Sequence, residues 1–371
     1  MPRPGTTTFG GHVRRLRSEK GMGQRELARA LDVSPSYLND IEKDKRVAPR
    51  PELVRAMADI LEADAERIFD LAGRSRNAIP PDVGELVLDN PDIVGLLRAI
   101  ADYGLNGAEI RRIKETMMAS NTRVLIIAAG LGSRMRSYTE NKPKCLLDFG
   151  GKTLLQRQLS VYKACGAKDI ALVRGYKKDK IKYKGIRYHE NPNFENNNIL
   201  NSIFCAEDEI NGHVIVAYSD ILFEDHVVRR LLDSEHDISI VVDIDWKGTY
   251  VGRKQHPIDE AENVIFDANN NVVNIGKILT DKRDVHGEFI GMMKLTPRGA
   301  EIFKRHFHRA KALYWGKPFQ RAETFEKAYL TDMIQEMADL GVPVHCVIIE
   351  RGWKEIDTVE DYEKALLEFE E

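Results

Sequence analysis

A short apolar run that ends in a glycine-rich turn is the part of this sequence best suited to chemistry. The run, residues 123–128, has the composition of a buried strand. Gly130 and Gly132 follow it, and glycine lets backbone N–H groups approach an anion closely because no Cβ is in the way. Arg134 and Lys144 then supply fixed positive charge for phosphate oxygens. The stretch predicts a loop that binds a polyphosphate.

Strand-like and helix-like blocks alternate after this turn, which indicates how the loop is positioned. The alternation predicts an α/β domain over residues 122–371, with a Rossmann-like mixed, mostly parallel sheet. Ligands of such sheets bind at the carboxyl ends of the strands. We expect strands at 124–128, 170–173, 214–218 and 238–242, and helices at 154–165, 199–208 and 227–232.

The glycine turn differs from two common phosphate-binding motifs. A dinucleotide-binding turn would carry glycine at position 135, where this chain has Met135, and the P-loop pattern is absent. The full pattern from Ala128 to Leu147, A-A-G-x-G-S-R followed by K-P-K-x-L-L, resembles the nucleotidyltransferases that make sugar nucleotides and the related cytidylyltransferases.

This resemblance implies roles for individual residues. Arg134 would face the β- and γ-phosphates, and Lys144 would stabilise charge on the α-phosphate during in-line attack. Asp220 and Asp357 resemble the two aspartates that hold the family's metal, which implies Mg²⁺. Each aspartate could instead be a helix cap or a surface acid. The expected nucleotide-binding residues are Ala129, Gly130, Gly132, Ser133, Asn198 and Ser202, of which the last two could equally belong to ordinary turns.

Several later segments carry the information about the acceptor. They are Asn191–Ser202, Val242–Trp246, Tyr250–Glu262, Ile275–Lys277 and His286–Lys294. Together these segments resemble the cytidylyltransferases that accompany phosphoenolpyruvate mutase in phosphonate biosynthesis, above all those acting on 2-aminoethylphosphonate. That resemblance implies transfer of CMP from CTP to a phosphonate with release of pyrophosphate. Phosphocholine and sugar phosphates are the alternative acceptors.

A phosphonate is an anion that carries its own nucleophilic oxygen, so it needs cations to position it more than a strong base. Arg253 and Lys277 are the candidates for that task. An ammonium on the acceptor would be met by acidic or aromatic groups, for which we select Asp243, Asp245, Trp246 and Glu288. Trp246 is equally explained as a core residue and Asp245 as a solvated one.

A separate module precedes this domain. Residues 1–55 carry 12 Lys/Arg against 7 Asp/Glu, the charge balance of a nucleic-acid binder. Within residues 8–72, the stretch from Gln24 to Glu42 resembles the helix-turn-helix of the lambda-repressor/Cro (XRE) family, with Ser34 as the cap of the second helix. A small helical bundle with solvated charges is the alternative. The resemblance implies DNA contacts by Gln24, Ser34, Ser36, Tyr37, Asn39, Lys43 and Arg46, usually in a dimer.

Two amphipathic helical patterns in residues 73–120 predict either a dimerisation element or a packed spacer. The chain has no stretch of 18 apolar residues, and its four cysteines lack C-x-x-C spacing, so we expect a cytoplasmic protein with reduced thiols. The fusion also allows a second interpretation, a transcription regulator whose enzyme-like domain senses a ligand. The presence of Arg134, Lys144, Asp220 and Asp357 favours an active enzyme.

Overall fold

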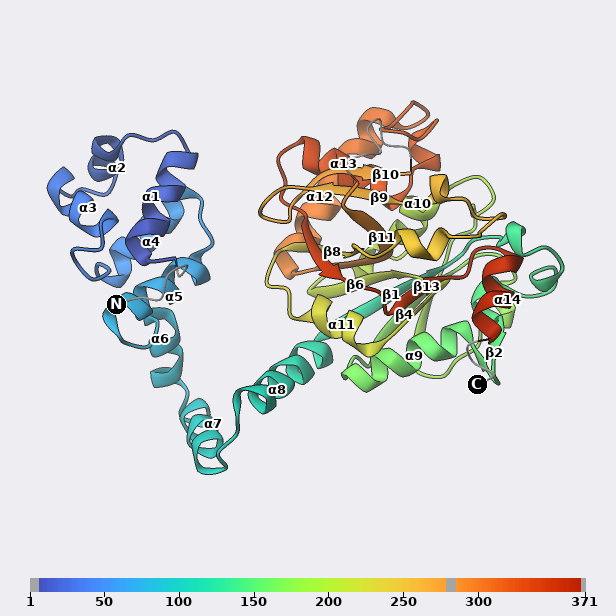
Figure 1. Cartoon of the computed structure of the whole chain (residues 1–371), viewed down its shortest axis with the longest axis horizontal. Coiled ribbons are helices and arrows are strands. Elements are labelled where there is room, and N and C mark those ends of the chain that lie inside the picture. The colour runs from blue at the N-terminus through green and yellow to red at the C-terminus, as the bar shows by residue number, and fades with distance from the viewer. Residues whose placement is uncertain (1–6, 278–284, 368–371) are drawn as a thin grey trace. The chain divides into compact units, whose positions relative to one another are not determined.

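The structure is a computed structural model that describes residues 7–277 and 285–367. It divides into two compact units, Met1–Gly107 and Ala108–Glu371, each drawn in Figure 1. This division falls inside the segment expected to connect the domains. Within the described residues, no helix is long and apolar enough to cross a membrane.

The first unit begins with five short helices. Their order and caps follow the expected helix-turn-helix. The Ser34 side chain accepts a hydrogen bond from the Tyr37 backbone N–H, and Pro35 occupies the first turn of its helix. Asp32 adopts a left-handed φ of 53° in the turn before it. The helices are α1 (Phe9–Glu19), α2 (Gln24–Ala30), α3 (Pro35–Glu42), α4 (Pro51–Leu61) and α5 (Ala65–Arg76).

A buried ion pair ties the helix-turn-helix to α1. The Glu42 carboxylate, at the end of α3, accepts from Arg17 Nε at 2.6 Å and from Gln24 Nε2 at 2.8 Å. Glu42 is 4% exposed, so these donors satisfy a carboxylate that water cannot reach. Apolar side chains from all five helices form the core around this contact, among them Val13, Leu27, Leu38, Met57 and Ile68.

Three further helices follow α5. They are α6 (Pro81–Asp89), α7 (Pro91–Asp102) and α8 (Gly107–Ser120). The Asn90 side chain caps α7, as its sequence pattern predicts. None of the residues of α7 is buried, although the helix carries five Ile, Val and Leu side chains. Leu96 of α7 is 49% exposed and Leu88 of α6 is 85% exposed. Helices α6 and α7 therefore present an apolar face that has no partner inside the described part of the first unit.

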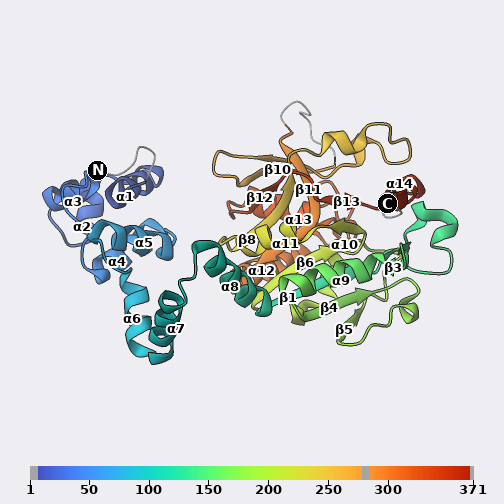
Figure 2. The same ribbon diagram turned by 60° about the horizontal axis from the view of Figure 1, so that its bottom comes forward.

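The second unit is built on a mixed nine-stranded sheet. Its order is β10-β9-β11-β6-β1-β4-β5, and β8 and β12 extend it from β11; Figure 2 shows β5 at one edge and β10 at the other. The pairs β6–β1, β1–β4, β4–β5 and β8–β12 are parallel, whereas β11 is antiparallel to β6, β8 and β9. The strands are β1 (Thr122–Ala128), β4 (Asp169–Arg174), β5 (Ile186–Glu190), β6 (His213–Tyr218), β8 (Ile238–Asp243), β9 (Asn263–Phe266), β10 (Val272–Gly276), β11 (Gly287–Leu295) and β12 (His345–Ile349).

Both faces of this sheet are buried. Leu125 and Ile127 of β1 join a cluster with α12 and α13, and the alternating Val124 and Ile126 join a second cluster with α9 and α11. A strand covered on both faces reads as a continuous apolar run, which is why β1 was recognisable from composition. The helices of this unit are α9 (Leu154–Cys165), α10 (Ile199–Phe204), α11 (Asp225–Leu232), α12 (Pro297–Tyr314), α13 (Leu330–Asp339) and α14 (Val359–Leu367).

Two small ribbons complete the unit. One pairs β2 (Asp148–Phe149) with β3 (Lys152–Thr153), and the other pairs β7 (Ile221–Phe223) with β13 (Trp353–Glu355). The α/β class and the mixed sheet are confirmed. The helix expected at 199–208 ends at Phe204, and a 3-10 turn covers Glu207–Glu209.

Candidate active site

A cavity of about 320 Å³ lies at the carboxyl ends of β1 and β6. The glycine turn after β1 forms one wall, and the segments after β6 and β13 form another. Its lining includes Gly130, Gly132, Lys144, Asp220 and Asp357, which come from widely separated parts of the sequence. The cavity therefore lies where the sequence predicts ligand binding, at the carboxyl ends of the strands.

The glycine turn has the geometry that its sequence implies. Gly132 adopts a φ of 63°, and an added Cβ would lie 3.2 Å from Cβ of Lys144. The Thr139 hydroxyl donates to the carbonyl of Gly132 at 2.8 Å and fixes the turn. A Cβ at Gly130 would meet no atom within 4 Å, so this side of the loop is open for a ligand.

Lys144 lies between two carboxylates on the cavity floor. Its Nζ is 2.9 Å from Asp220 Oδ2 and 2.6 Å from Asp357 Oδ1, and the lysine is 8% exposed. Burial lowers the pKa of Lys144, but the carboxylates of Asp220 and Asp357 outweigh burial and raise the pKa above its usual value. The ammonium is therefore charged at neutral pH.

Backbone pairing explains how two aspartates 137 positions apart come together. Glu355 is paired with Ile221 in the β13–β7 ribbon, and the Ile356 N–H donates to the carbonyl of Asp220 at 2.8 Å. This pairing places Asp357 beside Asp220, with Lys144 between them. Oδ1 of Asp220 is buried and has no hydrogen-bond partner among the described residues, so it offers a free lone pair for a cation.

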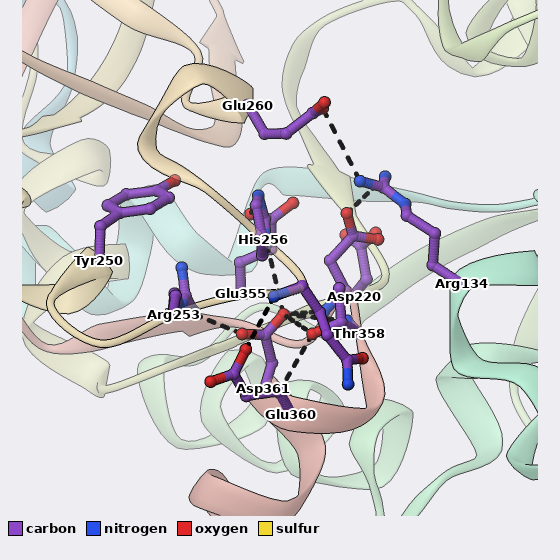
Figure 3. Close-up of polar contacts among 12 residues, drawn as sticks. Arg134, Asp220, Tyr250, Arg253, His256, Glu260, Glu355, Thr358, Glu360 and Asp361 are labelled. Carbon is purple, nitrogen blue, oxygen red and sulfur yellow. Dashed lines mark hydrogen bonds and ion pairs between the residues drawn. The ribbon is translucent and has the colours of Figure 1, made fainter.

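A third carboxylate, Glu355, lines the same cavity. Behind it, the buried His256 ring lies 3.5 Å from Glu355 Oε2 through Nε2 and 3.3 Å from Asp361 Oδ2 through Nδ1, as Figure 3 shows. Burial and the neighbouring Asp357 raise the pKa of Glu355. His256, Glu355 and Asp357 bring potential metal-ligand atoms within 4.8 Å of one another. Together with Asp220, the carboxylates of Glu355 and Asp357 supply the oxygen donors that fit a hard divalent cation such as Mg²⁺.

Arg134 extends from the glycine turn across the mouth of the site. Its Nη2 contacts Asp357 Oδ2, and its Nη1 is 3.8 Å from Glu260 Oε2, a contact drawn in Figure 3. Glu260 also accepts from Lys277 Nζ at 3.1 Å. Arg134 is about half exposed, so the guanidinium can exchange these carboxylates for phosphate oxygens.

The far end of the cavity is acidic. Glu262 and Glu288 both line it, and burial raises the pKa of each, that of Glu262 to about 8. The Tyr250 hydroxyl donates to Glu288 Oε1, whereas Glu288 Oε2 is buried and has no hydrogen-bond partner among the described residues. Lys277 lies 5.1 Å from the Tyr329 ring centroid on the same side.

The structure brings together most of the residues expected from the sequence. The cavity lining contains the predicted nucleotide residues Ala129, Gly130, Gly132, Ser133, Asn198 and Ser202, the predicted catalytic residues Arg134 and Lys144, both aspartates, and the acceptor residues Lys277 and Glu288.

Four expected acceptor residues lie elsewhere. Asp243 is fully buried and accepts from Trp353 Nε1 at 2.8 Å, which makes it a structural anchor. Asp245 forms an ion pair with Arg351 on the surface. Trp246 packs in a small apolar cluster with Tyr250.

The fourth, Arg253, pairs with Asp361 at 3.0 Å and lines a neighbouring cavity. We therefore do not assign these four residues to the acceptor, because Asp243, Asp245 and Arg253 have polar partners outside the cavity and Trp246 packs in an apolar cluster.

Sequence reasoning missed several residues of the site. Glu262 and Glu355 line the cavity, as do Tyr218, Tyr329 and Trp353. Glu355 had a usable signal, since it precedes Asp357 by two positions in a strand-like segment whose alternate residues share a face. Glu262 had none, because its burial depends on the packing of β9 against β11.

The residues expected to contact DNA lie on or next to the recognition helix α3. Ser34, Ser36, Lys43 and Arg46 are exposed, and Tyr37 and Asn39 are half-buried. Arg46 lies over the Tyr37 ring at 5.5 Å. Gln24 differs from the rest because its amide donates to Glu42, so it supports the helix-turn-helix from inside.

A glycine loop, a buried lysine and two clustered aspartates at the strand ends of a mixed α/β sheet define a nucleotidyltransferase site. Comparison with known families agrees with this class. Residues 124–273 match the MobA-like NTP transferase domain, and residues 8–69 match a helix-turn-helix domain. The chain thus carries a domain that matches the NTP transferase model, preceded by a domain that matches the helix-turn-helix model.

Its curated relatives include cytidylyltransferases. The chain is 26% identical over 251 residues to CTP:phosphoglutamine cytidylyltransferase of Campylobacter jejuni, which covers 64% of this chain and 97% of the relative. It is 24% identical over 238 residues to 2-aminoethylphosphonate cytidylyltransferase of Lancefieldella rimae, covering 62% and 86%. The solved structure of CTP:phosphocholine cytidylyltransferase from Streptococcus pneumoniae shares the fold, with a TM-score of 0.51, 22% identity, and coverage of 67% and 98%.

Proposed function

We propose that the second unit is a Mg²⁺-dependent cytidylyltransferase that transfers CMP from CTP to a small phosphonate, with 2-aminoethylphosphonate as the best candidate. The observation that carries this proposal is Lys144 held between Asp220 and Asp357 beneath an open glycine loop. A fixed ammonium at that position stabilises charge that develops on a transferring α-phosphate.

The residues divide the work of the transfer among them. The backbone of residues 129–133 holds the triphosphate, and Arg134 leaves its carboxylate partners to bind the β- and γ-phosphates. An acceptor oxygen attacks the α-phosphorus, one P–O bond forms, and the bond to the β-phosphate breaks. Pyrophosphate leaves with the electron pair of that bond, and Lys144 neutralises charge on the α-phosphate.

Asp220 and Asp357 would hold the metal, with Glu355 as a further oxygen donor nearby. The unpartnered Asp220 Oδ1 and the carboxylates on either side of Lys144 are the observations that support this fit. When bound, Mg²⁺ supplies positive charge that neutralises the phosphates and helps to orient them. Lys144 and Arg134 form ion pairs with these carboxylates. Binding of the nucleotide and the metal would therefore exchange these two side chains for the metal as partners of the carboxylates.

The choice of acceptor rests on the charge of the cavity. Among its lining residues are six carboxylates, Asp220, Glu260, Glu262, Glu288, Glu355 and Asp357, against the three cations Arg134, Lys144 and Lys277. Burial raises the pKa of Glu262, Glu288 and Glu355, and a metal and the cationic end of an acceptor would stabilise their ionised forms, which favours such an acceptor over a sugar phosphate that has no cationic group. Named relatives act on 2-aminoethylphosphonate and phosphocholine, which supports an acceptor of this kind.

Pyrophosphate release tests the proposal. The enzyme is incubated with Mg²⁺, each of the four NTPs, and 2-aminoethylphosphonate, phosphocholine or a hexose 1-phosphate in separate reactions. We expect release with CTP and the phosphonate. Pyrophosphate release with phosphocholine but not with the phosphonate would show that phosphocholine is the acceptor instead. No release with any pair of substrates would favour the ligand-sensor interpretation.

We also propose that the first unit binds DNA as a homodimer. One recognition helix reads only a half-site, so specific binding needs two copies. The apolar face on α6 and α7, which includes Leu86, Leu88, Leu96 and Leu97, is suited to hold a second copy.

The oligomeric state of the full-length chain tests this second proposal. We expect a dimer by light scattering, and a monomer with weaker DNA binding for the double variant Leu96→Glu, Leu97→Glu. A matched Leu313→Glu variant changes an exposed leucine on α12 and should stay dimeric. A wild-type monomer in solution would contradict the proposal.

A further inference from the structure

Glu288 is a buried carboxylate that lines the cavity. Among the buried carboxylates of the described lining, only Glu288 has an oxygen without a hydrogen-bond partner and no ion pair with a protein cation. It lies at the start of β11, where it is paired with Asp243 of β8 and Asn263 of β9. The side chain is 2% exposed and lines the acidic end of the cavity. The Tyr250 hydroxyl satisfies Oε1. Oε2 has no partner among the described residues.

A buried oxygen without a donor is costly, and native structures rarely keep one without a reason. The neighbouring groups do not supply a donor. The amide of Asn263 is directed to the carbonyls of Ala261 and Lys277, and Nζ of Lys277 is bound to Glu260. No group of the described residues donates to Glu288 Oε2, so this oxygen is available to a donor on a molecule bound in the cavity.

We propose that Glu288 Oε2 accepts a hydrogen bond from an N–H-bearing cation on the acceptor, so that the enzyme selects primary ammonium acceptors over quaternary ones. This inference rests on the proposed cytidylyl transfer and adds the chemistry of the acceptor's far end. A trimethylammonium group carries no N–H and would leave Oε2 unsatisfied, whereas a primary ammonium supplies three donors.

Two aromatic residues of the cavity, Tyr218 and Tyr329, support the same distinction. A quaternary ammonium is usually held by the faces of several aromatic rings. Here the Tyr329 ring already faces the ammonium of Lys277. The Tyr218 ring packs so closely on Gly291 that a Cβ there would lie 2.4 Å from it. These rings are engaged by the protein, so the carboxylate is the better recognition element.

Charge favours the same occupant. Glu262 lies beside Glu288 in the lining, and its nearest side-chain donors, the hydroxyls of Tyr218 and Thr331, are both 3.5 Å away. Burial raises the pKa of Glu288 well above its usual value, so an arriving ammonium would restore the ionised carboxylate and form a charge-assisted pair. A neutral hydroxyl in the same place would gain only an ordinary hydrogen bond.

Two pairs of acceptors test the inference. Phosphoethanolamine and phosphocholine differ only in three N-methyl groups, as do 2-aminoethylphosphonate and its N-trimethyl analogue. With CTP and Mg²⁺, we expect kcat/KM for each primary amine to exceed that of its trimethyl partner by at least about tenfold, the direction expected when a polar site loses its partner. Equal or better use of the trimethyl compounds would overturn the inference.

The Glu288→Gln variant separates hydrogen bonding by a carboxylate from exclusion by size. We expect the preference for the primary amine to shrink to within about threefold, because the amide keeps the shape and loses the charge. A preference that stays undiminished in Glu288→Gln would also overturn the inference, since size would then explain it. Glu301→Gln, an exposed residue of α12, is the matched control and should keep the wild-type preference.

The failure of this inference can be told apart from the failure of the proposed function. If no acceptor supports pyrophosphate release, cytidylyl transfer itself is wrong. If acceptors react without regard to N-methylation, transfer stands and only the role of Glu288 is wrong. The thermal shift caused by CTP and Mg²⁺ checks that Glu288→Gln is folded and still binds nucleotide.

Discussion

Replacing Lys144 by methionine removes one positive charge from the centre of the site while keeping a side chain of similar length. Its Nζ lies 2.6 Å from Asp357 and 2.9 Å from Asp220. At an effective dielectric constant of about 20, each contact has a gross Coulomb energy of about 6 kcal/mol. Desolvation of the buried ions cancels most of that attraction.

We expect a net loss of about 3 kcal/mol in the free energy of unfolding, at the lower end of the range for breaking a buried pair. The loss stays near this lower end because Arg134 still contacts Asp357, and because Asp220 keeps about a quarter of its side chain exposed. Added Mg²⁺ should recover part of the loss, since the two carboxylates are then free for the metal.

Turnover should fall by about 10²–10⁴-fold, the usual effect of removing a group that stabilises charge in the transition state. Pyrophosphate release measures the rate, and urea unfolding with and without Mg²⁺ measures stability. Lys168→Met changes an exposed lysine and serves as the control. Turnover of Lys144→Met within tenfold of the wild type, in a folded protein, would refute the role of this lysine.

Four further predictions concern other parts of the chain. Asp220→Asn should raise the Mg²⁺ concentration for half-maximal pyrophosphate release by about tenfold or more, because a metal-binding carboxylate is lost; unchanged Mg²⁺ dependence would contradict this. Burial raises the pKa of Glu262 from 4.5 to about 8. The contribution of protonated Glu262 to the free energy of unfolding is therefore present below pH 4.5 and falls as the pH rises to 8. Glu262→Gln should flatten that fall in urea unfolding, and a slope like that of the wild type would count against it. Arg46→Gln should reduce the salt dependence of DNA binding by about one phosphate contact, as salt titrations of DNA binding can show. Glu42→Gln should destabilise the first unit by about 3–5 kcal/mol, because Arg17 is left without its buried partner; calorimetry of the full chain would detect it as a lower first transition.

The fold was predictable where local pattern decides structure. Ser34 and Pro35 set the start of α3 by capping and by a fixed φ. The unbroken apolar run of β1 reflects burial on both faces of the sheet. The antiparallel placement of β11 between β6 and β8 was not predictable, since it depends on long-range pairing that no local pattern encodes.

The candidate site divides in the same way. The roles proposed for Gly132 and Lys144 follow from their type and spacing, and both residues line the same cavity. Asp243 and Trp246 have suitable chemistry, but strand register and packing direct them into the core. Glu262 enters the cavity through the pairing of β9 with β11. Residue type therefore suggested the reaction, whereas tertiary packing decides which residues meet the acceptor.

The identity of the reaction product tests cytidylyl transfer most directly. The enzyme is incubated with CTP, Mg²⁺ and 2-aminoethylphosphonate, and the products are followed by ³¹P NMR. We predict equal amounts of pyrophosphate and of a product in which the phosphonate phosphorus is joined through oxygen to the α-phosphorus of CMP. Release of free CMP, or no change in the CTP signals while the same protein still binds CTP, would contradict it.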